Sequence, residues 1–214
     1  GAEQISGTNF ADTINAGADA DGVVILGNGG ADIITGGSGT DMLDGGLGND
    51  TIVYGTGNDS IFGGAGDDSI DDNLGGFVVG DNWIEGGSGN DTIWNGSGND
   101  TVYGGDGDDL IDDHGGGELQ GNSVLYGDAG ADTIWAGVGN HSVYGGADAD
   151  RLFAEAGDDW VEGGTGDDSL IGGDGNDTLD GGQGADAVYG DAGNDVINLT
   201  AADLAADVAF GGAG

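Results

Sequence analysis

The chain has 214 residues, of which 54 are glycine, and it contains neither proline nor cysteine. Its 41 acidic residues face a single base, Arg151, so the formal net charge is −40. Without proline the chain is not collagen-like, and without cysteine it has no disulfides or thiolate metal sites. The charge disfavours nucleic acid and anionic membranes as partners and favours cations. We recognise no 18-residue apolar run and no N-terminal signal peptide, and we expect no membrane span.

A nine-residue unit recurs along the chain and reads Gly-Gly-x-Gly-x-Asp, with an aliphatic residue two positions after the aspartate. Eight windows match without a fault, beginning at residues 36, 45, 63, 86, 104, 163, 172 and 181. Looser copies fill the gaps, so that twenty units cover about residues 7–198. Three units are enlarged, at 16–26, 72–85 and 113–126, and the stretch from Ile70 repeats without gaps from Ile111, 41 residues later. We find no linker, and we predict one continuous repeat array over residues 1–214.

Each unit predicts a turn of six residues followed by a strand of three, because glycine permits positive φ and triplets such as 51–53 and 92–94 favour strand. Two units form a coil of about eighteen residues with one strand in each of two sheets, and the coils stack about 4.8 Å apart. The middle residue of each triplet points inward: Leu43, Ile52, Ile70, Ile93, Ile111, Leu170, Leu179 and Val188.

This apolar core is too small to hold the chain together unaided. One buried aliphatic contributes roughly 1.5–3 kcal/mol, whereas ordering a residue costs about 1–2 kcal/mol in backbone entropy alone. Aspartates eighteen residues apart would also lie one coil apart and repel each other. A hard cation with oxygen ligands between the coils removes both difficulties. Calcium accepts six to eight oxygens with loose geometry, magnesium is stricter, and zinc would need more nitrogen or sulfur than His114 and His141 supply.

The nonapeptide closely resembles the RTX repeats of haemolysin-type secreted bacterial proteins, over about residues 7–198. The resemblance implies an all-β fold, a right-handed parallel β-roll of about ten 18-residue coils, with calcium held between turns. Each ion would take the aspartate and turn carbonyls of one repeat and those of the repeat two further on. The resemblance also implies export from a Gram-negative bacterium by type I secretion, with the chain disordered at low calcium and folding outside the cell.

The units alternate between two edges of the roll and therefore predict two columns of metal ligands, with about thirteen calcium ions in all. On one edge the column is unbroken: Asp12, Asp32, Asp50, Asp68, Asp91, Asp109, Asp132, Asp150, Asp168 and Asp186. On the other edge the predicted ligands are Asp21, Asp41, Asp59, Asp100, Asp159, Asp177 and Asp195. We expect nine sites on the first edge. On the second we expect two sites at each end and a poor or empty middle, where Asn82, Ser123 and His141 replace aspartate.

Two alternatives to a purely structural role remain open at this stage. His141 is either a transition-metal ligand or base, or the remnant of a lost calcium site; we favour the latter and predict no catalytic residues. Aromatic side chains occupy outward positions. Either they recognise a glycan or protein together with the enlarged units, as in an extracellular adhesion module, or they pack along the sheet. The outward aromatic residues are Phe62, Trp83, Trp94, Tyr103, Tyr126, Trp135, Tyr144, Phe153, Trp160 and Tyr189.

The last sixteen residues depart from the repeat. Residues 211–214, Gly-Gly-Ala-Gly, match the first four positions of a further turn, which suggests that the sequence is a piece of a longer protein. Residues 199–210 lack the turn motif, and either Thr200 and Asp203 cap a short helix or the segment is an enlarged unit. A flanking enzyme, toxin or adhesin domain cannot be identified from this segment.

Overall fold

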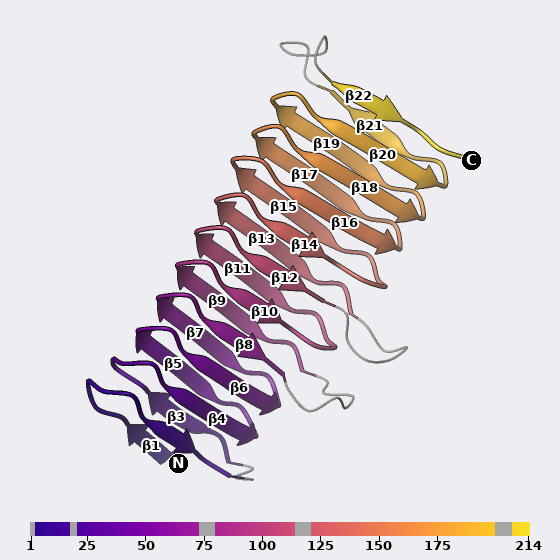
Figure 1. Cartoon of the computed structure of the whole chain (residues 1–214). Coiled ribbons are helices and arrows are strands. Elements are labelled where there is room, and N and C mark those ends of the chain that lie inside the picture. The colour runs from indigo at the N-terminus through magenta and orange to yellow at the C-terminus, as the bar shows by residue number, and fades with distance from the viewer. Residues whose placement is uncertain (1–2, 18–20, 73–79, 114–120, 200–206) are drawn as a thin grey trace.

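The computed structural model describes residues 3–17, 21–72, 80–113, 121–199 and 207–214, and every regular element in these ranges is a β-strand. The chain winds as a solenoid in which consecutive strands alternate between two parallel sheets (Figure 1). Pairing continues without a break from the first strand of each sheet to the last. No helix long and apolar enough to cross a bilayer occurs among the described residues. The predicted all-β, two-sheet solenoid is confirmed.

The first sheet contains the eleven odd-numbered strands in sequence order. They are β1 (Glu3–Ser6), β3 (Val23–Leu26), β5 (Met42–Leu47), β7 (Ser60–Ala65), β9 (Trp83–Ser88), β11 (Thr101–Asp106), β13 (Val124–Ala129), β15 (Ser142–Ala147), β17 (Trp160–Thr165), β19 (Thr178–Gln183) and β21 (Val196–Asn198).

The second sheet contains the eleven even-numbered strands, also in sequence order. They are β2 (Thr13–Asn15), β4 (Ile33–Ser38), β6 (Thr51–Thr56), β8 (Ser69–Asp71), β10 (Thr92–Trp94), β12 (Leu110–Asp112), β14 (Thr133–Trp135), β16 (Arg151–Ala156), β18 (Ser169–Asp174), β20 (Ala187–Ala192) and β22 (Val208–Phe210).

The register places equivalent positions of the repeat side by side. Ile93 of β10 pairs with Ile70 of β8 on one side and with Ile111 of β12 on the other. Ile70 precedes Ile93 by more than one regular coil because the enlarged unit 72–85 lies between them, yet the pairing is unchanged. The register is therefore the same on both sides of the enlarged unit, and the inward face stays inward.

The core is a double row of aliphatic side chains between the sheets. Ile93 is fully buried, while its neighbours Thr92 and Trp94 are directed toward the other face. The predicted inward residues Leu43, Ile52, Ile70, Ile93, Ile111, Leu170, Leu179 and Val188 are all fully buried. Three further core residues, Tyr54, Ala136 and Ala154, stand at the first position of a unit, where most units have glycine.

The C-terminal segment continues the roll. Strand β22 pairs with β20, so that Val208 lies beside Ala187 and Phe210 beside Tyr189. Ala213 forms a bridge with Ala192, and Gly212 has a φ of 73°, as expected for the start of another turn. Of the two interpretations of residues 199–210, the pairing supports the enlarged unit. Thr200 and Asp203, the alternative helix cap, lie outside the described residues, as does His114.

Candidate metal sites

The aspartates of the first edge form a continuous chain of hydrogen bonds along the roll. In each case the backbone N–H of one aspartate donates to Oδ1 of the aspartate one coil further on, as Asp91 does to Asp109 at 2.8 Å. The same bond, between 2.7 and 3.1 Å, joins Asp12, Asp32, Asp50, Asp68, Asp91, Asp109, Asp132, Asp150, Asp168, Asp186 and Asp207 in sequence. The structure therefore brings the whole predicted column together.

The second carboxylate oxygen, Oδ2, is the atom that requires a ligand. In nine residues of the first edge, Oδ2 is buried and accepts no hydrogen bond from the described residues. These are Asp32, Asp50, Asp68, Asp91, Asp109, Asp132, Asp150, Asp168 and Asp207. Asp12, at the N-terminal end, differs because its Oδ2 accepts the backbone N–H of Thr8 at 2.6 Å and the Thr8 hydroxyl at 2.9 Å. Buried anionic oxygens without donors are costly, so this column fits a row of bound cations.

Carbonyl oxygens from the neighbouring coil accompany these carboxylates from Asp32 to Asp168. A methyl group on Gly86 would lie 2.5 Å from Asp91 Oδ2 and 2.6 Å from the carbonyl oxygen of Gly104, so both oxygens border the same small space. The third glycine of the motif adopts positive φ, for example 125° at Gly89, and the Gly66 carbonyl of the preceding coil lies against it. Glycine is needed here because a side chain would fill the space between carboxylate and carbonyl oxygens.

The donor set consists of a few carboxylates supplemented by backbone carbonyls. Within the described ranges, no group of three or more His, Cys, Asp or Glu side chains is arranged to hold a metal ion. Sites built here must therefore complete their shell with main-chain oxygens. Calcium accepts such a mixed oxygen shell, whereas zinc sites are normally built from several His or Cys side chains.

The electrostatics of the column favour charge compensation. The pKa of Asp132 is raised to about 8, first by burial and then by the nearby carboxylates of Asp150, Asp109 and Asp108, and the amide hydrogen bond from Asp109 only partly opposes this. Burial likewise raises the pKa of Asp109 and of Asp68 to about 7. At neutral pH these carboxyls need either a proton or a cation.

On the second edge the hydrogen-bond chain persists although three aspartates are missing. Asn82 Oδ1 accepts the N–H of Asp59 at 3.0 Å, Ser123 Oγ accepts that of Asp100 at 3.2 Å, and His141 Nδ1 accepts that of Ser123 at 3.1 Å. Continuous bonds also join Asp41 to Asp59, His141 to Asp159, Asp159 to Asp177, and Asp177 to Asp195. The replacements preserve the backbone contact and lose the second anionic oxygen.

In the same region, side chains at the first position of the unit occupy the space that glycine leaves open elsewhere. Asn95 is fully buried, and its Nδ2 donates to Asp100 Oδ2 at 3.1 Å and to Asp113 Oδ1 at 2.6 Å. Asp113 Oδ2 lies 3.5 Å from His141 Nδ1. Burial raises the pKa of Asp113 well above its usual value, and it lowers the pKa of His141. The amide of Asn95 thus bridges two carboxylates where a cation would otherwise be required.

Three features of these columns were not predicted correctly or were missed. Asp21 was aligned with Asp41, but the register pairs Val24 with Met42, and it is the N–H of Val23 that donates to Asp41 Oδ1 at 2.8 Å. Asp207 extends the first edge and was missed because its unit lacks the glycine motif. The polar residues Asn95 and Asp113 were also missed, although their replacement of the first glycine is visible in the sequence.

The fold and its acidic edges define a class of protein, the calcium-binding repeat solenoids. A model of the RTX calcium-binding nonapeptide repeat matches residues 1–23, 24–52, 55–75, 79–112, 119–140, 142–170 and 162–197. These matches cover most of the chain, which therefore belongs to the RTX repeat family and is a calcium-binding structural domain. A search of curated protein sequences found no match.

Proposed function

We propose that this chain is a non-catalytic structural module that folds when it binds calcium outside the cell. The observation that carries the proposal is the column of buried Oδ2 atoms that accept no hydrogen bond from the described residues, in Asp32, Asp50, Asp68, Asp91, Asp109, Asp132, Asp150, Asp168 and Asp207. Adjacent carboxylates about one coil apart repel by roughly 1 kcal/mol even in water, and by more where water is excluded. A chain with this much glycine and a net charge of −40 has little other stabilisation to set against that repulsion.

The hydrogen-bonded columns support a proposal of about thirteen ions. Ten neighbouring pairs run along the first edge from Asp12 to Asp207. Three pairs on the second edge retain two aspartates: Asp41 with Asp59, Asp159 with Asp177, and Asp177 with Asp195. Thirteen divalent ions would change the formal charge from −40 to −14. The middle of the second edge, at Asn82, Ser123 and His141, is proposed to hold no calcium of this kind.

Secretion is part of the same proposal. RTX repeats are typical of proteins exported by type I secretion, and extracellular calcium is high enough to fill weak sites with dissociation constants of about 10⁻⁴–10⁻³ M. A chain that stays unfolded at low calcium and folds at high calcium suits export followed by folding. No residues in this segment are proposed to be catalytic, and any activity of a longer protein would reside elsewhere.

Circular dichroism during a calcium titration tests the proposal. We expect a coil spectrum in excess chelator and a strand spectrum with added calcium, with a cooperative midpoint at sub-millimolar to millimolar calcium. Metal analysis after equilibrium dialysis against a buffer of fixed, saturating calcium should give about thirteen bound ions per chain above the buffer level. A strand spectrum that a strong chelator leaves unchanged would show that cations do not hold the fold.

A further inference from the structure

The outer surface of the first sheet has a row of aromatic side chains along neighbouring strands. Tyr103 and Tyr126 stack with ring centroids 4.7 Å apart and an interplanar angle of 3°, and Tyr126 and Tyr144 stack at 4.8 Å and 10°. The flat faces between these three rings are covered by each other. The middle of the row is thus packed as a ladder, and it offers little to a ligand that must stack on a ring face.

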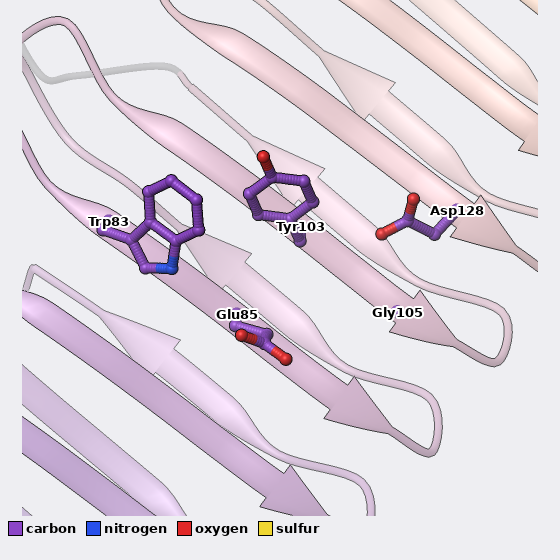
Figure 2. Close-up of a pocket in the computed structure, with 5 residues that line it drawn as sticks. All are labelled: Trp83, Glu85, Tyr103, Gly105 and Asp128. Atoms are coloured by element: carbon purple, nitrogen blue, oxygen red, sulfur yellow. The ribbon is translucent and has the colours of Figure 1, made fainter.

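The parallel stacking of the rings ends at Trp83. The indole lies 5.0 Å from the ring of Tyr103, but the two planes are tilted by 42° instead of being stacked. A pocket of about 270 Å³ is lined by Trp83, Glu85, Tyr103, Gly105 and Asp128. Figure 2 shows the two rings beside each other and the carboxylates of Glu85 and Asp128 on the same face. Two aromatic walls and two carboxylates define the chemistry of this pocket.

Asp128 stands where the fold favours glycine. In the sheet it pairs with Gly105 on one side and Gly146 on the other, and these in turn pair with Gly87 and Gly164. Its φ of 74° is in the left-handed region, which costs a residue with a Cβ about 1–2 kcal/mol relative to a right-handed conformation. Asn28, Glu155 and Asp191 adopt the same conformation at this position of their units, but Asp128 is the one whose exposed carboxylate lines this pocket.

We propose that this pocket binds the guanidinium group of an arginine presented by an extended basic segment of another polypeptide. A planar guanidinium stacks on indole and phenol rings and is attracted to carboxylates, so it uses both features of the pocket. The chain's single base, Arg151, lies in β16 of the other sheet and cannot serve from within the molecule. The net charge, −40 without calcium and still −14 with thirteen ions bound, would also attract a basic partner to the protein.

The surroundings suit a polypeptide better than a small cation. Glu85, Tyr103, Tyr126, Tyr144 and Glu162 occupy the same register position on five adjacent strands. At about 4.8 Å per strand this row extends about 19 Å, the length of roughly six residues of extended chain. The pocket therefore lies at one end of a strip with a carboxylate at each extremity, along which a basic segment could lie.

The other end of the row provides a matched control. Trp160 and Glu162 have the same Trp-x-Glu spacing as Trp83 and Glu85, and both tryptophans are similarly exposed, at 42% and 44%. Asp128 lies on β13, two strands from either tryptophan, but the pocket that its carboxylate lines is the one beside Trp83, where the indole is tilted against Tyr103. Equal attraction at the two ends would reflect the general charge of the protein and not the pocket.

The test uses NMR of the full chain in saturating calcium, following the indole N–H signals of the four tryptophans. The probe is the blocked peptide Gly-Arg-Gly-Arg-Gly, and its control has uncharged, isosteric citrulline in place of arginine. We expect a saturable shift of the Trp83 signal, assigned with Trp83→Phe, with the arginine peptide only. Glu85→Gln combined with Asp128→Gly should weaken binding at least about fivefold, whereas Glu162→Gln should change it less than about twofold.

Each other outcome would overturn the proposal. Equal shifts with the citrulline peptide would exclude guanidinium recognition, and equal weakening by Glu162→Gln would show unspecific attraction to an acidic surface. A Trp83 shift with a neutral oligosaccharide and none with the arginine peptide would assign the pocket to a glycan. Circular dichroism of every variant in the same calcium solution separates loss of binding from loss of the calcium-dependent fold, so failure of the proposed function would be recognised independently.

Discussion

Replacing Asp109 by asparagine should remove two calcium ions and destabilise the calcium-loaded fold. Asp109 Oδ1 accepts the N–H of Asp91 at 2.8 Å, and asparagine keeps that oxygen, as Asn82 does for Asp59 at 3.0 Å. What asparagine loses is the buried, anionic Oδ2. Because Asp109 borders both the Asp91 and the Asp132 coils, the sites on its two sides should be affected together.

The magnitude follows from binding linkage. At a calcium concentration ten times its dissociation constant, a site stabilises the folded chain by about 1.4 kcal/mol, so the loss of two sites costs about 3 kcal/mol. Urea unfolding in fixed calcium measures this difference, and metal analysis should show two ions fewer per chain. In excess chelator the variant should lose this disadvantage in the free energy of unfolding. Burial raises the pKa of Asp109 to about 7, so above that pH the chain with a neutral asparagine should be no less stable than the chain with a charged aspartate.

Asp108→Asn is the matched control. Asp108 is the preceding residue, loses the same charge on substitution, and has an Oδ1 that accepts the N–H of Ala131 at 2.9 Å, which asparagine can also do. Asp108 is exposed, whereas Asp109 is buried. We expect a change below about 0.5 kcal/mol and no loss of calcium for Asp108→Asn. Equal effects of the two substitutions would refute the assignment of the buried column as the calcium-binding element.

Three further predictions concern pH, the turn glycines and the second edge. In excess chelator, strand content should rise as the pH falls from above 8 to about 5. The reason is that burial raises the folded-state pKa of Asp132 to about 8, against a usual 3.8, so that the folded state gains protons in this range. A circular dichroism spectrum that does not change with pH would contradict this. Gly107→Ala, at a φ of 131° and against the Gly89 carbonyl, should destabilise by about 2 kcal/mol or more in urea unfolding. Gly29→Ala, whose methyl would have its nearest neighbour at 3.6 Å, should have little effect. His141→Asp should add one bound calcium, next to Asp159, whereas His141→Asn should add none in metal analysis.

The repeat period alone determined most of the architecture. Because every inward aliphatic stands at the same place in the unit, the core positions from Leu43 to Val188 could be predicted individually, and the structure buries each of them. The first edge could be predicted for the same reason, since its units from residue 27 onward keep a constant distance between aspartate and strand. A fixed register leaves no freedom for alternative pairings once one face is buried.

The errors lie where this constant distance fails. The enlarged unit 16–26 contains two acidic residues, Asp19 and Asp21. The repeat spacing selected Asp21, but Val23, two residues later, takes that place in the ladder. Asp207 could have been found from its distance to strand 208–210, which equals the distance of Asp186 from strand β20. The glycine motif does not mark Asp207, because residues 199–206 contain no glycine.

The middle of the second edge could not be predicted from the linear motif, because it depends on a contact between two positions of the same unit. In a regular unit the first glycine lies against the aspartate Oδ2 of the same turn, so a side chain at one position constrains the other across the turn. Asn95 with Asp100, and Asp113 with Ser123, each combine one carboxylate with one uncharged polar residue at this pair of positions. Considered singly, Ser123 and Asn95 are departures from the motif. Considered as pairs, they keep one carboxylate in each turn.

This pairing explains why the two edges of one solenoid can differ. On the first edge the Oδ2 atoms from Asp32 to Asp168 accept no hydrogen bond from the described residues, so a cation is the remaining way to satisfy them. In the middle of the second edge, protein donors replace the cation: Asn95 Nδ2 bridges Asp100 and Asp113, and Asn82 Nδ2 donates to the Gly80 carbonyl at 3.1 Å. Because these turns do not have to close around an ion, residues can be inserted there without breaking the register, and two of the enlarged units, 72–85 and 113–126, occur at this place. Calcium removal should therefore act first on the edge that lacks such donors.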